Sequence, residues 1–153
     1  MCDYSLAGLR SRLAVTGEEL IAYRFPTGSI GLTSPAELEA HKHEVRGWWS
    51  RLRAHDWPCA VCVPPGARLV LRDIPKRLQT QLGLKETEEA TFIQIDALPG
   101  RHRDALRFAN NQEALLQRLA EGQRLQVIYL PWDDEPEESR GEQLELAAVE
   151  PPY

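Results

Sequence analysis

Short runs of β-branched, aromatic and aliphatic residues recur along this chain, and each run ends at a turn signal such as Pro-Gly, Asn-Asn or Glu-Gly. Strands joined by turn-sized links pair antiparallel, because a parallel pair needs a crossover of about a dozen residues or more. The sequence therefore predicts an α+β, mainly β fold, a small antiparallel barrel or sandwich. The predicted strands cover residues 19–25, 29–33, 59–63, 67–72, 90–96, 105–108, 113–119 and 124–130.

Two segments carry helix signals instead. The run Ser34-Pro35-Ala36-Glu37 combines an N-cap serine, a proline at the first helical position and a glutamate at the capping-box position, which together predict a helix start. Apolar side chains then recur every three or four residues, so we expect one amphipathic helix over about residues 35–54. A short helix over about residues 75–82 is expected to end at Gly83.

Charge divides the chain into two parts. Residues 132–153 hold eight acidic side chains and one basic side chain, a net charge of −7, whereas the whole chain has −5 and residues 1–131 are therefore near +2. The acidic stretch has too few apolar residues to order itself. We expect residues 1–131 to form a single globular, strand-rich domain and residues 132–153 to form a mobile acidic tail.

Composition excludes several classes of protein. No run approaches the roughly 18 apolar residues that span a bilayer, and the first residues lack the apolar core of a secretory signal, so we expect a cytoplasmic protein without a membrane partner. The near-neutral body has no cluster of Lys and Arg, which argues against nucleic acid as a partner. The motifs of nucleotide-binding loops, serine hydrolases and zinc proteases do not occur in the sequence.

The three cysteines are the most reactive side chains in the sequence. Cys59 and Cys62 have the C-x-x-C spacing of many redox and zinc sites. They fall in a predicted strand, however, where residues three apart point to opposite faces and lie roughly 10 Å from one another. We therefore interpret the spacing as accidental, with a core role for one of the two thiols.

Cys2 becomes the first residue if Met1 is removed, as small second residues usually permit. A thiol beside a free α-amine can use that amine as its base, or both groups can chelate a metal. The alternative is that a cysteine at the second position has no function.

Among the four histidines, His102 has the most suggestive neighbour. His102 and Asp104 are two apart at the start of a predicted strand, which places both on one face. Such a pair can act as a base and the residue that orients it, or as two metal ligands. A surface polar pair without function is the alternative. His41 and His43 lie about 200° apart around the predicted helix, so they do not share a metal.

Several separated segments resemble a group of small uncharacterised bacterial proteins that begin with MCDYSL. Cys2, Cys62, His102 and Asp104 match the recurring polar residues of that group, whereas Arg103 stands where shorter members often have His. The two-tryptophan helix looks like an insertion relative to those members. The resemblance brings no activity with it. The similar segments are residues 1–6, 61–66, 102–108 and 119–131.

The leading hypothesis is a thiol-based or transition-metal site in which Cys2, Cys62 and His102 converge. Asp104 would orient the imidazole of His102. Two thiolates and an imidazole favour zinc or iron over calcium or magnesium.

Two further hypotheses stay open. In one, Cys2 is the nucleophile of an enzyme that processes amides after removal of Met1. In the other, the chain is a non-catalytic module that binds a basic protein through Trp48, Trp49 and the acidic tail. The sequence alone does not decide whether the protein is an enzyme.

Overall fold

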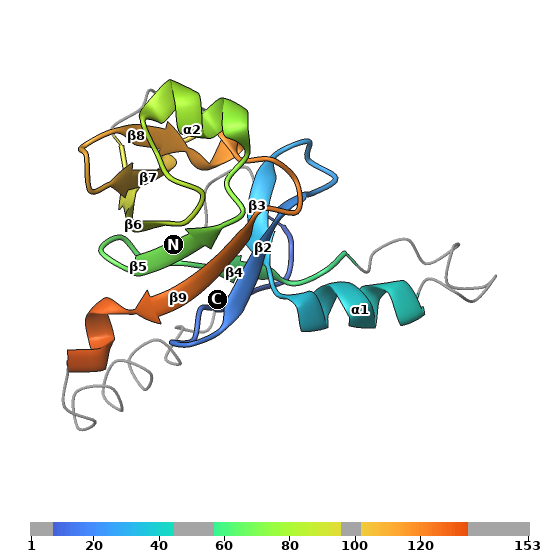
Figure 1. The fold of residues 1–153 in the computed structure, drawn as a ribbon. Coiled ribbons are helices and arrows are strands. Elements are labelled where there is room, and N and C mark those ends of the chain that lie inside the picture. The colour runs from blue at the N-terminus through green and yellow to red at the C-terminus, as the bar shows by residue number, and fades with distance from the viewer. Residues whose placement is uncertain (1–7, 45–56, 96–101, 135–153) are drawn as a thin grey trace.

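The computed structural model describes residues 8–44, 57–95 and 102–134. Within these residues, seven strands form one antiparallel sheet in the order β3-β2-β9-β5-β6-β7-β8, and β1 and β4 form a separate parallel pair. The large sheet curls into a half-barrel, with α2 at one end and α1 extending outward from the β2–β3 side (Figure 1). The predicted mainly β fold is confirmed. The elements are β1 (Ser11–Leu13), β2 (Glu19–Arg24), β3 (Ile30–Thr33), α1 (Pro35–Glu44), β4 (Ala60–Cys62), β5 (Arg68–Arg72), α2 (Lys76–Leu82), β6 (Glu88–Gln94), β7 (Asp104–Phe108), β8 (Glu113–Leu115), η3 (Leu116–Arg118), β9 (Arg124–Tyr129) and η4 (Pro131–Asp134).

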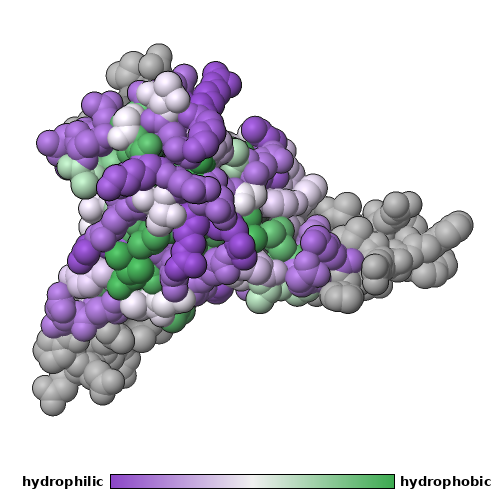
Figure 2. Space-filling view, viewed as in Figure 1, coloured by the Kyte–Doolittle hydropathy of each residue, from purple (hydrophilic) through white to green (hydrophobic). Residues whose placement is uncertain are grey.

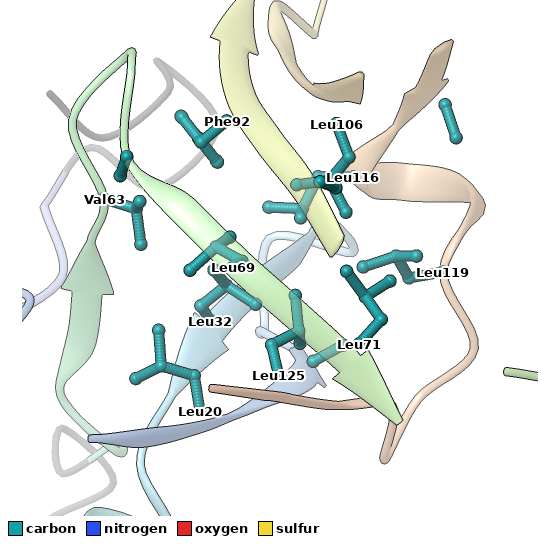
Figure 3. Packing of buried hydrophobic residues seen from close by; sticks show 14 of the residues in the cluster. Leu20, Leu32, Val63, Leu69, Leu71, Phe92, Leu106, Leu116, Leu119 and Leu125 are labelled. Carbon is teal, nitrogen blue, oxygen red and sulfur yellow. The ribbon is translucent and has the colours of Figure 1, made fainter. Parts of the chain in front are cut away.

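One face of the curled sheet buries the core. Along β5, Leu69 and Leu71 are fully buried while Arg68 and Arg72 are exposed, because successive side chains of a strand point to opposite faces. Figure 3 shows leucines from β2, β3, β5 and β9 pointing toward one another. Full burial of a side chain of this size contributes roughly 1.5–3 kcal/mol, so this shared apolar face determines the register of the sheet.

The opposite face of the sheet carries cross-strand ion pairs. The face that presents β5, β9 and β2 is largely hydrophilic, with smaller apolar areas between the strands (Figure 2). Each pair is about half exposed, so each contributes only about 0–1 kcal/mol. Their main effect is that three arginines of this face each have a neighbouring glutamate. The pairs are Arg124–Glu19 at 2.6 Å, Arg68–Glu89 at 2.6 Å and Arg107–Glu113 at 2.8 Å.

Helix α1 begins where the sequence predicts. Ser34 caps it, because the Glu37 amide donates to Ser34 Oγ at 3.2 Å and the Leu38 amide donates to the Ser34 carbonyl at 3.1 Å. The Glu37 carboxylate pairs with Arg12 of β1 at 3.6 Å. Residues 45–54 of the predicted helix lie outside the described residues.

Helix α2 confirms the second predicted helix. It ends at Gly83, whose φ of 65° is the left-handed conformation that glycine adopts without strain. The Leu84 amide closes the cap by donating to the Gln79 carbonyl at 2.9 Å. Among the described residues, no helix has the length and apolar character needed to cross a membrane.

The predicted strand over residues 113–119 is only partly correct. Its first three residues form β8, and the next three form the 3₁₀ helix η3. Leu116 and Leu119 are both buried, and a spacing of three residues brings them to one side of a 3₁₀ turn. The Gln117 side chain donates to the Ile30 carbonyl and accepts from the Ile30 amide, both at 2.7 Å, so it pairs with β3 as a strand neighbour would.

β1 and its parallel pairing with β4 were not predicted from the sequence. β1 has three residues, of which only Arg12 is partly buried, so it shows neither the length nor the apolar content of a typical strand. It pairs with β4 across the whole β2–β3–α1 segment. This pairing is a long-range contact that local patterns do not reveal.

The start of the acidic segment packs on the domain. Pro131–Asp134 form η4, where Asp133 accepts hydrogen bonds from the Thr16 hydroxyl at 2.6 Å and the Leu130 amide at 2.9 Å. The Tyr129 hydroxyl donates to Asp134 at 2.8 Å, and this bond raises the pKa of the phenol. Residues 135–153 lie outside the described residues.

Candidate functional site

Cys62 is the last residue of β4 and is 8% exposed. The parallel pairing places it opposite Leu13 of β1, and its carbonyl accepts a hydrogen bond from the Ala14 amide at 3.0 Å. Its sulfur takes part in a disulfide bond. A buried cysteine in a short braced strand therefore carries a covalent link.

Cys59 differs chemically from Cys62. It is a half-buried free thiol, and its sulfur donates to the Ala60 carbonyl at 3.7 Å. Burial raises the pKa of this thiol and the nearby Glu37 raises it further, against smaller effects of Arg12 and Arg10. The thiol form is favoured, so Cys59 is a weak nucleophile. The two cysteines of the C-x-x-C do not form a disulfide with each other, as the strand geometry predicted.

Cys2, the third cysteine of the chain, lies outside the described residues. Its place in the predicted site stays a prediction. The same holds for Trp48 and Trp49 of the predicted binding helix.

Asp104 is a buried carboxyl group, 7% exposed, at the start of β7. It lies directly opposite Gln94 of β6, whose side-chain amide donates to it at 3.0 Å. Asp104 alternates with Leu106 and Phe108, both buried, so it lies on the core-facing side of the sheet. A carboxyl group at such a position requires hydrogen-bond partners, and Gln94 supplies one.

Gln94 was not predicted from the sequence as a residue of this site. One signal was present, because Gln94 continues the alternation of Ala90 and Phe92 and so falls at a core-facing position of the predicted strand. A polar residue at such a position needs a partner of its own.

His102 is half-buried and precedes β7 by two residues. The β6–β7 pairing continues past the strand ends, because the Ile95 amide donates to the Arg103 carbonyl at 2.9 Å. This extended backbone favours the predicted arrangement in which His102 and Asp104 share one face.

A tight turn follows the cysteine strand and lies beside β6. After β4, the Gly66 amide donates to the Phe92 carbonyl and the Phe92 amide donates to the Ala67 carbonyl, both at 2.8 Å. Figure 3 shows Val63, which follows Cys62, on the same side of the core as Phe92. Phe92 is two residues before Gln94. The fold therefore places the segment that follows β4, at Gly66 and Ala67, beside Phe92 of β6.

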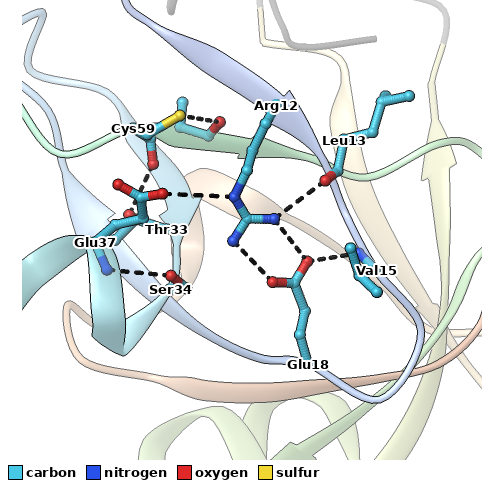
Figure 4. Close-up of polar contacts among 9 residues, drawn as sticks. Arg12, Leu13, Val15, Glu18, Thr33, Ser34, Glu37 and Cys59 are labelled. Atoms are coloured by element: carbon cyan, nitrogen blue, oxygen red, sulfur yellow. Dashed lines mark hydrogen bonds and ion pairs between the residues drawn. The ribbon is translucent and has the colours of Figure 1, made fainter.

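A polar network braces the other end of the cysteine strand (Figure 4). The Arg12 guanidinium donates to both carboxylate oxygens of Glu18, at 2.8 and 3.2 Å, and this bond raises the pKa of Arg12. The same guanidinium pairs with Glu37 of α1, and the Thr33 hydroxyl donates to the Cys59 carbonyl at 2.8 Å. β1, α1 and the start of β4 are thus tied together.

His41 has a packing role. Its ring stacks on Trp57, with centroids 6.0 Å apart and planes 23° from parallel. Across residues 8–44, 57–95 and 102–134, no group of three or more His, Cys, Asp or Glu side chains is arranged to hold a metal ion. A metal site of the predicted composition would therefore need Cys2 as a ligand.

Comparisons with family models, with curated proteins and with solved structures found no match to this chain.

Proposed function

We propose that the protein carries a redox-sensitive thiol pair formed by Cys2 and Cys62, with His102 as the neighbouring imidazole. The observation that carries the proposal is that Cys62 is bonded to another sulfur while Cys59, three residues away, is a free thiol. The chain has three cysteines, so Cys2 is the remaining candidate for the partner.

The chemistry is thiol–disulfide exchange with a small-molecule disulfide. Cys62 is buried, so the thiolate of Cys2 is the group that attacks, forming a mixed disulfide and releasing one thiolate of the oxidant. The thiolate of Cys62 then attacks Cys2, closing the internal disulfide and releasing the second thiolate. The two protons lost by the cysteines pass to the two thiolates that leave, so the chain is oxidised by two electrons and the small disulfide is reduced.

The imidazole of His102 would accept the proton from the attacking thiol of Cys2. Asp104 is a positioning residue, because a carboxyl group on the same face can fix the orientation of the ring. Gln94 in turn holds Asp104 through its 3.0 Å hydrogen bond.

In the reduced state, two thiolates and an imidazole form a donor set suited to zinc or iron. Cys62 and His102, which lie among the described residues, would be two of the ligands, and Cys2 would be the third. Such an ion would hold the two sulfurs together without a covalent bond between them.

The thiol pair is tested by counting free thiols and measuring intact mass after purification in air. Wild type is expected to show one reactive thiol, from Cys59, and a mass that rises by two hydrogens on reduction. The Cys62→Ser variant should lose that mass change. Cys59→Ser, a substitution in the same segment, should keep it and serve as the control. Three reactive thiols in wild type, or a mass change lost only in Cys59→Ser, would refute the pairing.

The metal version has its own measurement. Reduced wild type and Cys2→Ser are each loaded with zinc, dialysed and analysed for bound metal. If wild type and Cys2→Ser both retain negligible zinc, the metal site is refuted. That result does not contradict the thiol pair. The intact mass also shows whether Met1 is retained, which would exclude Cys2 as an N-terminal nucleophile.

A further inference from the structure

A surface cavity lies between helix α2 and the segment that contains η3, away from the cysteine strand. Its volume is about 360 Å³, at the lower end of the range of small-ligand pockets. None of the residues that line it is acidic. The lining residues are Pro75, Arg77, Leu78, Gln81, Arg118 and Ala120.

Two of these residues are arginines whose charge is not cancelled. The Arg118 guanidinium donates to the neutral Gln81 amide at 3.1 Å, and no carboxylate within the described part of the chain pairs with Arg77 or Arg118. Four other exposed arginines of the domain do have such partners, namely Arg24 with Glu121, Arg68 with Glu89, Arg107 with Glu113 and Arg124 with Glu19, whereas Arg72 bonds the neutral Gln126. The cavity therefore holds two arginines that have no carboxylate partner among the described residues.

The nearest acid along the chain does not offset this charge. Glu121 follows Ala120 directly, but its carboxylate is engaged by Arg24 at 2.6 Å. Gln81 fixes the guanidinium of Arg118 in place, which lowers the entropy that a ligand would otherwise lose in ordering it. One wall of the cavity is apolar, formed by Pro75, Leu78 and Ala120.

We propose that this cavity binds a small molecule that carries a phosphate group. Two guanidinium groups match the charge of a phosphate dianion, and their planar donors bond its oxygens in pairs. The apolar wall would accept the organic part of the ligand. Neither arginine takes part in the proposed thiol chemistry, so the test of the phosphate site does not depend on the test of the thiol pair.

The test is a titration of ¹⁵N-labelled full-length protein with phenyl phosphate, followed by NMR. We expect saturable shifts of amides in residues 75–81 and 118–120. Arg77→Gln and Arg118→Gln should each weaken binding about tenfold, with the remaining amide signals unchanged to show that the fold is intact. Arg107→Gln, which removes another exposed arginine that has a glutamate partner, should bind as wild type does.

Two further probes separate the chemistry of the ligand. Inorganic phosphate should cause shifts at the same amides with weaker binding, because it lacks a group to contact the apolar wall. Benzoate should bind more weakly than phenyl phosphate. Benzoate binding as tightly as phenyl phosphate overturns the assignment to phosphate. Amide shifts that do not saturate overturn the site itself. So does a loss of affinity in Arg107→Gln as large as that in Arg77→Gln.

Discussion

Opening the disulfide at Cys62 should lower the stability of the whole domain. Under the proposed pairing, the bond joins Cys2 to Cys62 and closes a loop of about 60 residues. The loop spans β1, β2, β3 and α1, so a large part of the unfolded chain is constrained while the bond is closed. Reduction frees that part of the unfolded chain and so favours unfolding.

The size of the effect follows from the loop length. Closing a loop of about 60 residues removes enough chain entropy from the unfolded state to stabilise the fold by about 4 kcal/mol. Strain in the folded state and residual structure in the unfolded state reduce this value, so 2–4 kcal/mol is the expected range. With a urea dependence of about 2 kcal/mol per molar, the unfolding midpoint should fall by about 1–2 M.

The assay is urea unfolding of wild type, Cys62→Ser and Cys59→Ser, each with and without a reductant. Wild type and Cys59→Ser should lose stability on reduction, whereas Cys62→Ser should start near the reduced midpoint and not respond. A reduced wild type that unfolds at the same urea concentration as the oxidised protein would refute the reasoning. So would a Cys62→Ser variant that still responds to the reductant.

Three further predictions concern single contacts. Gln94→Leu removes a donor to the buried Asp104 and should destabilise the domain by about 1–3 kcal/mol in urea unfolding; a change below about 0.5 kcal/mol would mean that this bond does not matter. The raised pKa of Cys59 means that iodoacetamide should modify oxidised wild type more slowly than a free peptide thiol at pH 8, with a rate that climbs as the pH is raised further; equal rates at pH 8 contradict this. Thr16→Val removes the hydroxyl that donates to Asp133 and should cost about 0.5 kcal/mol while exposing residues 131–134 to faster amide exchange; unchanged exchange there argues against docking of η4 through this bond.

Local patterns predicted most of the elements. The strands β2, β5 and β9 alternate more and less buried residues, and each begins within two residues after a glycine, so both signals are visible in the sequence. The two helices are predicted from their capping residues. Ser34 caps the start of α1 and Gly83 caps the end of α2, and both caps depend only on immediate neighbours in the chain. Each of these features is decided within a few residues of chain.

Long-range contacts were beyond the reach of such patterns. β1 is too short and too polar to stand out, and its pairing with β4 depends on a contact between segments about 50 residues apart. The bidentate pairing of Arg12 with Glu18 needs the observed backbone to bring the two side chains together. Residues 113–119 have the composition of a strand, but only residues 113–115 form one. Residues 116–118 form a 3₁₀ turn, in which the Gln117 side chain bonds the backbone of Ile30 in β3.

The brace around β4 bears on how the thiol pair could work. A strand of three residues has little stability of its own, and a redox site must keep its geometry in both states so that its sulfurs can meet again. β4 is held by its pairing with β1, by the Thr33 hydroxyl on the Cys59 carbonyl, and by burial of Val61 and Val63. None of these contacts involves the sulfur of Cys62. Reduction should therefore lower the global stability while leaving β4 in place, so that the pair can close again without refolding.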